Sequence, residues 1–172
     1  MIILWLGLLA CEDIKSEKVL EQEKFEGPSI EMDSVTLFFT DSTKVKIKLQ
    51  ALKELVMENN DKEFPEGVYI EFFDEKEAVS SVLVADRGYY VKRKDHYRAE
   101  GNVVLYNVAS KDELSTEELI WTPKDEQVHT DKFVTIKSED EIHTGEGLTA
   151  DQDFGSYTIL NPSGTLSLEE TF

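Results

Sequence analysis

The sequence predicts an all-β protein of the sandwich, barrel or jelly-roll type, built from many short antiparallel strands. Two observations support this prediction. Runs of β-prone residues recur from Ser29 onward, and glycine or proline lies between the runs or at their edges. Glycine supplies positive φ and proline presets a turn corner, so both separate strands. With 172 residues, of which 40% are apolar, the chain suits one packed domain.

The first ten residues, Met1 to Ala10, are uncharged and almost wholly apolar, and Cys11 follows them directly. An apolar segment of ~7–15 residues that ends in small residues is typical of a secretory signal peptide. Leu8-Leu9-Ala10-Cys11 also resembles the lipobox of bacterial lipoproteins, whose cysteine is lipidated and becomes the acylated N-terminus. The resemblance implies that residues 1–10 are a signal-peptide h-region and that Cys11 carries a lipid anchor. The alternative is a buried apolar segment with an incidental cysteine.

Residues 11–28 are predicted to be the lipidated cysteine and an acidic tether. Glu12 to Gly27 hold six acidic and three basic residues, and the few apolar ones keep poor helical spacing. Gly27-Pro28 is a turn signal that closes the segment. The β domain is therefore expected over residues 29–172.

Within that domain, Val45 to Leu49 alternate apolar and charged residues, as in a strand with one wet face. Leu49 to Asn60 also fits helical spacing, so a helix is the alternative there. Three similar segments, starting at Gly101, Lys132 and Ser163, recur 31 to 32 residues apart, which favours stacked hairpins. The remaining expected strands are Val68–Phe73, Val82–Ala85, Tyr89–Val91, Val103–Tyr106, Leu119–Trp121, Phe133–Ile136, Tyr157–Leu160 and Leu166–Leu168.

Charge and motif content exclude several function classes. The net charge of -18 argues against a nucleic-acid partner, because phosphate binding needs clustered Lys and Arg. It argues equally against electrostatic docking on anionic lipid heads, so contact with a membrane is expected through apolar groups or a covalent anchor. No pair of His or Cys has zinc-type spacing, and Gly145 to Leu148 lacks a dinucleotide fingerprint. His96, His129 and His143 are expected on solvent-facing strand positions. We therefore predict no metal, no cofactor and no enzyme activity.

Five segments in order resemble the LptC family of periplasmic lipopolysaccharide-transport proteins. The specific pieces are Ala85-Asp86, Gly101-Asn102-Val103, the Thr-Glu-x-Leu-x-Trp pattern ending at Trp121, Val128 to Ile136, and Gly145-Glu146-Gly147-Leu148-Thr149-Ala150-Asp151. The resemblance implies a twisted, open β jelly roll that binds lipopolysaccharide acyl chains between two sheets. It also implies lipid transfer from an inner-membrane ABC transporter to a periplasmic bridge protein of the same fold.

One feature departs from that family, whose members often carry a single transmembrane helix. This chain offers a lipobox instead, which implies a membrane-anchored lipoprotein in the periplasm, on the inner membrane. By the resemblance, the segment near Val35 to Phe39 faces the transporter. The strands near Tyr157 to Leu168 face the bridge protein, by addition of strands at an open sheet edge.

Alternation places sets of apolar residues on one face of each strand, where they line either a lipid groove or an ordinary sandwich core. From the residues alone, both interpretations stay open. Gly145 and Gly147 are expected to serve a structural turn or bulge. The predicted groove residues are Ile47, Leu49, Leu83, Val103, Leu105, Leu119, Trp121, Val134, Ile136, Leu148 and Ile159.

Two other functions compete with lipid transport. The first is a structural adaptor lipoprotein that joins envelope proteins through its strand edges without binding lipid. The second is an envelope hydrolase or sugar-binding lipoprotein, which would need exposed aromatics such as Tyr89, Tyr90 or Tyr157 grouped around a pair of carboxylates.

Overall fold

The computed structural model describes residues 27–41 and 43–167. Within these ranges the chain forms eleven strands and no helix, which confirms the predicted all-β class. The predicted signal segment, Cys11 and most of the tether lie outside the described residues. The strands are β1 (Ile30–Asp41), β2 (Lys44–Val56), β3 (Lys62–Phe64), β4 (Val68–Phe73), β5 (Val79–Ala85), β6 (Arg87–Val91), β7 (His96–Asn107), β8 (Glu113–Thr122), β9 (Gln127–Lys137), β10 (Glu141–Asp151) and β11 (Tyr157–Ser167).

All described strand pairs are antiparallel and belong to one continuous sheet that divides into two halves. Strand β7 shows the division, because residues 96–100 pair with β6 whereas residues 104–107 pair with β5 on the same side. Strand β2 is shared in the same way between β4 and β3. We call these the β4–β5 half and the β3–β6 half, and the long strands β7 to β10 run through both.

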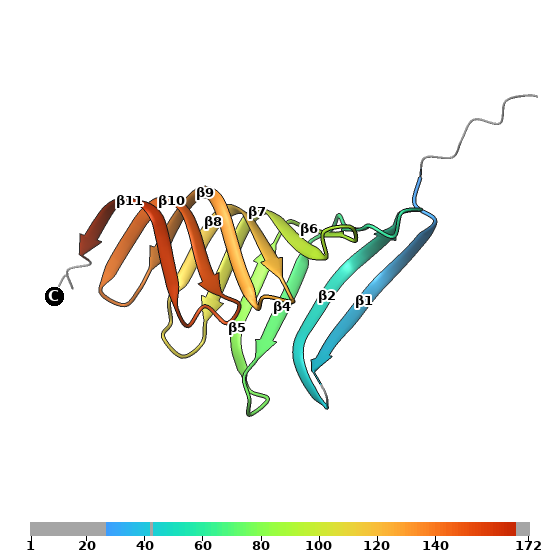
Figure 1. Ribbon diagram of the computed structural model, residues 1–172, viewed down its shortest axis with the longest axis horizontal. Coiled ribbons are helices and arrows are strands. Elements are labelled where there is room, and N and C mark those ends of the chain that lie inside the picture. Colours follow the sequence, from blue (N-terminus) through green and yellow to red (C-terminus); the bar gives the residue numbers. More distant parts are fainter. Residues whose placement is uncertain (1–26, 42, 168–172) are drawn as a thin grey trace, which may run out of the picture.

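Irregularities in register mark the line along which the sheet bends. They lie between Glu100 and Val103 on β7, between Thr116 and Ile120 on β8, and on either side of Glu146 on β10. An extra residue in one strand of a pair bends that strand and increases its twist. Figure 1 shows the result, with β9, β10 and β11 bending over like arches so that the two ends of each strand point the same way. The sheet therefore folds back on itself in the manner of a jelly roll.

The strands are longer than the sequence predicted, and the helix alternative for Leu49 to Asn60 is wrong. Strand β2 continues to Val56 because β1 pairs with it along its whole length, from Asp41↔Lys44 to Ile30↔Val56. The two short strands expected near the C-terminus are one strand, β11. Local residue runs reveal where a strand is most apolar, whereas strand length depends on the partner beside it.

The core lies between the two halves, on the inward faces of β2 to β5 and β7 to β10. Its fully buried members include Phe64, Phe72, Leu105, Leu114 and Ile136, each at most 1% exposed. Val35, Leu37 and Phe39 of β1 are partly buried against it. Strand β1 thus contributes to the interior at one edge of the sheet, and β11 forms the opposite edge.

Candidate functional site

The residues predicted to line a groove come together in the interior between the two halves. Leu49, Leu83, Leu105 and Ile136 belong to a single row across the β4–β5 half, in which Ile70 and Leu114 are the intervening members. Ile159 is partly buried against the interior. The other ten predicted residues are each at most 4% exposed: Ile47, Leu49, Leu83, Val103, Leu105, Leu119, Trp121, Val134, Ile136 and Leu148. Their role as lipid contacts remains a prediction.

Trp121 stands at the centre of an aromatic cluster that connects the two halves. Its ring stacks on Tyr97 at 5.0 Å between centroids. It also meets Phe39 of β1 and Phe72 of β4 edge-on, at 5.6 and 5.9 Å. Burial raises the pKa of Tyr97, so its phenol stays neutral. Phe72 was predictable because it shares a face with Ile70. Tyr97 is the cross-strand partner of Trp121, whereas Phe39 reaches Trp121 only because the sheet folds back on itself, since β1 and β8 are not paired.

The interior is filled by its own side chains. The cavity between Leu49, Phe72, Leu83, Leu119 and Trp121 has a volume of about 20 Å³, which is room for about one water molecule. An acyl chain therefore needs the two halves to separate, or the core side chains to move aside, before it enters.

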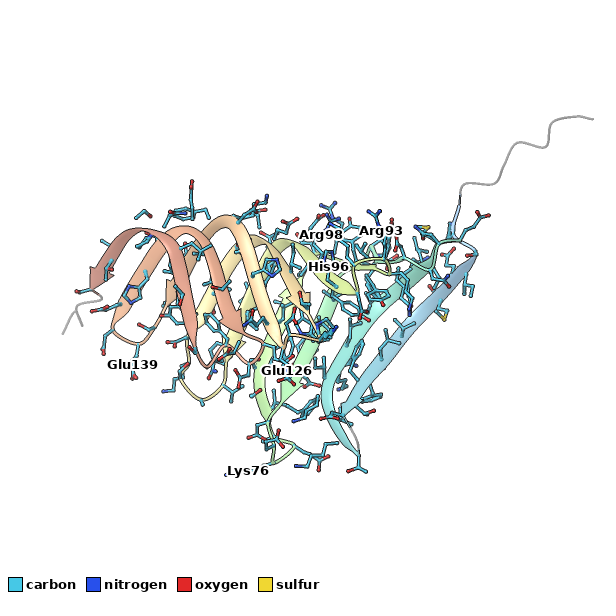
Figure 2. The ribbon with its side chains drawn as sticks, in the orientation of Figure 1. Lys76, Arg93, His96, Arg98, Glu126 and Glu139 are labelled. Carbon is cyan, nitrogen blue, oxygen red and sulfur yellow. The ribbon has the colours of Figure 1, made fainter. Side chains whose placement is uncertain are left out.

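A loop between β10 and β11 crosses from one half to the other. Gln152 accepts a 3.1 Å hydrogen bond from Nε1 of Trp121, and its backbone carbonyl accepts a 3.4 Å bond from Oγ of Ser81 on β5. Nδ2 of Asn107, at the end of β7, donates to the carbonyl of Asp153 at 2.9 Å. Phe154 of this loop is 1% exposed and stacks on Tyr157 at 5.1 Å. The backbone N–H of Gln152 also donates to the carbonyl of Glu126 at 3.0 Å. Glu126 lies on the lower side of the molecule in Figure 2. We call residues 151–156 the strap, because these bonds tie together the free ends of the two halves.

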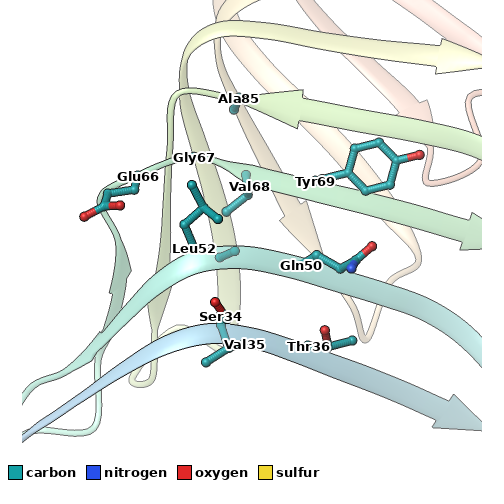
Figure 3. Close-up of a pocket in the computed structure, with 11 residues that line it drawn as sticks. Ser34, Val35, Thr36, Gln50, Leu52, Glu66, Gly67, Val68, Tyr69 and Ala85 are labelled. Atoms are coloured by element: carbon teal, nitrogen blue, oxygen red, sulfur yellow. The ribbon is translucent and has the colours of Figure 1, made fainter.

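A surface groove of about 410 Å³ opens at the other side of the interior, next to β1. It lies where β2 leaves β4, after the pair Gln50↔Tyr69, and before β2 meets β3 at Leu55. Ala51 of β2 and Val68 of β4, both inward-facing core residues, form part of its wall. Figure 3 shows Leu52 reaching across this gap toward Val68. We call this groove the window, since it approaches the core without a strand in the way.

A buried charge marks the β1 end of the interior. Glu54 is fully buried, and its Oε1 lies 2.6 Å from Nζ of Lys62 on β3. Its Oε2 accepts no hydrogen bond from the residues that the structure describes. Moving charges out of water is costly even when they are paired. The purely apolar part of the interior therefore ends near Glu54.

The motif pieces Ala85-Asp86 and Gly101-Asn102 meet at the corner between β5 and β6. The backbone of Asp86 donates to the carbonyl of Gly101 at 3.0 Å, and Nδ2 of Asn102 donates to Oδ2 of Asp86 at 2.7 Å. Gly101 and Asn102 both have positive φ, 77° and 45°, which glycine and asparagine tolerate best. These residues thus fix the point where the chain passes from one half to the other.

Gly145 and Gly147 lie at the register irregularities of β10. A Cβ on Gly145 would come within 2.6 Å of the carbonyl oxygen of Asn161 and 2.9 Å of Cα of Pro162 on β11. Gly147 has a φ of 76°. Glycine thus occupies both positions at which β10 bends, and at Gly145 a side chain would collide with β11.

The side chains considered for metal or sugar binding lie as follows in the described part of the chain. The described ranges contain no group of His, Cys, Asp or Glu side chains fit to hold a metal ion. Tyr89 and Tyr90 on β6 lie five strands away from Tyr157 on β11, so these three tyrosines do not gather at one place. His129 is exposed, whereas His96 and His143 are half-buried. Residues 27–41 and 43–167 include no helix of the length and apolarity that a bilayer crossing requires.

Comparison with known proteins agrees with this architecture. Residues 1–166 match the family described as lipopolysaccharide-assembly, LptC-related. No curated protein matches the chain. The family match covers nearly the whole sequence and assigns the chain a role in lipopolysaccharide transport at the cell envelope. The chain belongs to the LptC-related family of lipopolysaccharide-assembly proteins.

Proposed function

We propose that the chain transports lipopolysaccharide by holding its acyl chains between the two halves of the sheet. The observation that carries this proposal is the apolar interior itself, whose central row runs uninterrupted from Leu49 to Ile136 across six strands. Burial of a methylene group is worth ~0.8 kcal/mol, so several acyl chains are bound by many small contributions. Such binding needs no bond to be made or broken.

Acyl chains enter at the window, because there the core is reached without breaking a strand pair. The interior holds a cavity of only about 20 Å³, beside an open groove of about 410 Å³. In the proposed cycle the halves separate from the β1 side, and the tails replace contacts that core side chains make with one another. The charged head stays outside, since a chain of net charge -18 repels phosphate.

Partner proteins add strands at the two open edges of the sheet. Strand β1 pairs only with β2, and β11 pairs only with β10, among the described residues. Unpaired backbone groups on an edge strand accept a further strand. We assign the β1 edge to the inner-membrane ABC transporter and the β11 edge to a periplasmic bridge protein of the same fold. The interior would then continue from one protein to the next.

The anchor belongs to the same proposal. Lipidation of Cys11 after removal of residues 1–10 would hold the domain on the periplasmic side of the inner membrane. Two or more acyl chains make such an anchor stable. Cys11 lies outside the described residues, so its support is the lipobox sequence alone.

Photocrosslinking tests the lipid site. A photoreactive residue at Val134 or Trp121, both buried, should capture lipopolysaccharide in cells with an active transporter. The same residue at Thr135, which follows Val134 and points to the opposite face, serves as the matched control. Lipopolysaccharide adducts at neither inward position, in folded protein, would refute the proposal.

The filled interior favours a second candidate, an adaptor that joins envelope proteins through its edges without binding lipid. Charged substitutions at inward positions separate the two. If a protein with Leu83→Lys remains folded and assembled and transport continues, the adaptor function is supported. Loss of transport with assembly intact supports the lipid site.

A further inference from the structure

The turn between β6 and β7 carries an isolated group of positive charge. Lys92, Arg93 and Lys94 are consecutive and exposed. Among residues 27–41 and 43–167, none of the three forms an ion pair through its side chain. The whole chain has 36 acidic residues against 18 Lys and Arg. Three free cations in a row are therefore unexpected, and we call residues 92–94 the basic turn.

The carboxylates beside the basic turn are engaged in holding its backbone and its base. Oδ1 of Asp61 accepts a 2.8 Å hydrogen bond from the backbone of Lys92. Oδ1 of Asp95 accepts a 2.8 Å bond from the hydroxyl of Tyr90. The two acids thus fix the shape of the turn, while the three cationic side chains extend into solvent.

Further positive charge lies directly behind the turn. Arg98 of β7 stacks over the ring of Tyr89 at 4.7 Å and pairs with Oε1 of Glu100 at 3.1 Å. Burial lowers the pKa of His96, and the charges of Lys94, His129 and Arg98 lower it further. The charges of Lys94 and Arg98 thus reach His96 at the base of the turn, although the chain as a whole is strongly acidic.

The basic turn lies on the side of the molecule where the described chain begins. Asp61, which binds the turn, belongs to the β2–β3 connection, and this connection follows Val56, the partner of Ile30. Figure 1 shows the start of β1 on the upper side, and Figure 2 shows Arg93 on that side with Lys76 on the opposite one. Ile30 and Met32 of β1 are exposed apolar residues there, at 52% and 38%.

The distance to the proposed anchor is short. Gly27 follows Cys11 by sixteen positions in the sequence, and an extended chain spans at most ~3.5 Å per residue. A lipid on Cys11 therefore keeps Gly27, three residues before β1, within ~55 Å of the bilayer surface. Attraction between Lys or Arg and anionic lipid heads would turn the basic side of the domain toward that surface.

We propose that the basic turn binds the phosphate groups of anionic phospholipids in the membrane that anchors the chain. This inference rests on the anchor in the proposed function. Contact at residues 92–94 would place the window and the β1 edge near the membrane, where lipopolysaccharide is extracted. The chain-wide charge led to the opposite expectation, because a sum over the sequence does not show that three cations share one turn.

Hydrogen exchange on the full chain tests the proposal. The purified chain is reconstituted into vesicles of phosphatidylcholine alone or with about one-third phosphatidylglycerol, and into phosphatidylcholine vesicles that contain lipid A. We expect the amides of residues 91–96 to exchange at least about fivefold more slowly with phosphatidylglycerol, and high salt to abolish this protection. The triple variant Lys92→Gln, Arg93→Gln, Lys94→Gln should lose it. The matched variant Lys76→Gln, Lys111→Gln, Lys124→Gln removes the same charge from other exposed loops and should keep it.

Equal exchange in all vesicles overturns the proposal, and so does equal protection in the two triple variants. Protection by lipid A without protection by phosphatidylglycerol overturns the choice of phospholipid and assigns the turn to lipopolysaccharide phosphate instead. Mass spectrometry of the same sample shows whether Cys11 carries lipid. If Cys11 carries no lipid, the anchor in the proposed function is refuted. The exchange measurement still decides whether the basic turn binds phospholipid, because the vesicles are supplied to the protein.

Discussion

The indole Nε1 of Trp121 lies 3.1 Å from Oε1 of Gln152, so the aromatic centre of the interior is hydrogen-bonded to the strap that crosses between the halves. Trp121 also contacts Phe39 of β1 and Phe72 of β4. One side chain thus touches the β1 edge, the β4–β5 half and the strap. Any movement that admits a guest near Trp121 disturbs at least one of these contacts.

The substitution Gln152→Leu should loosen the strap without unfolding the sheet. It removes the acceptor for Trp121 at similar volume, and a buried donor left unpaired costs ~1–3 kcal/mol. We expect faster hydrogen exchange at residues 152–156 and unchanged exchange in β7. Gln127→Leu, on an exposed position of β9, is the control. Unchanged exchange in the strap would show that the Trp121 bond does not hold it closed.

The substitution Leu105→Ala should destabilise the fold strongly. Leu105 is fully buried in the central row, and truncation of a buried leucine to alanine costs ~2–5 kcal/mol. Val84→Ala, at a position 37% exposed on the opposite face of β5, should change stability by less than ~1 kcal/mol. Urea unfolding of both variants measures the difference. Similar losses would mean that the interior is not the tightly packed core described above.

The inward faces of the strands were predictable from the sequence, because alternation alone separates Val134 and Ile136 from Thr135. The three similar segments starting at Gly101, Lys132 and Ser163, which predicted stacked hairpins, coincide with the bend. Each of them lies at or just after the place where β7, β9 or β11 turns into the β4–β5 half. Their spacing is the length of one hairpin, and so it reports stacking of successive antiparallel pairs.

The strap and the window were not predictable in the same way. Gln152 meets Ser81, and Asp153 meets Asn107, across 71 and 46 residues of sequence. These contacts depend on how far the sheet bends, which no local pattern states. Likewise, Ala51 and Val68 border an opening only because β2 leaves β4 after Gln50.

Stability should fall as the pH drops, in part through His96. Burial, followed by the charges of Lys94, His129 and Arg98, lowers the pKa of His96. The unfolded chain then binds a proton more readily than the folded one, so folding is favoured above ~pH 6.5 and loses this contribution as the pH falls through the lower folded value. His96→Gln should show a smaller loss of unfolding free energy between about pH 7.5 and pH 5.5 than wild type. His143→Gln, on β10, is the control, and parallel curves for wild type and His96→Gln would contradict the prediction.

Substitutions at Gly145 and Gly164 test whether the bend of β10 holds β11 in place, the edge strand that we assign to the bridge protein. A Cβ on Gly145 would collide with Ile159 and with the backbone of Asn161 and Pro162, whereas a Cβ on Gly164 meets only Oγ1 of Thr144 at 3.5 Å. Overpacking against backbone costs ~1–3 kcal/mol.

Gly145→Ala should therefore displace β11 and expose its amides to hydrogen exchange, while Gly164→Ala on the same strand pair should leave them protected. If strand addition at β11 joins the chain to a bridge protein, Gly145→Ala should also weaken that complex in a pull-down and Gly164→Ala should not. Intact binding by a Gly145→Ala protein whose β11 has become exchangeable would show that the bridge docks elsewhere.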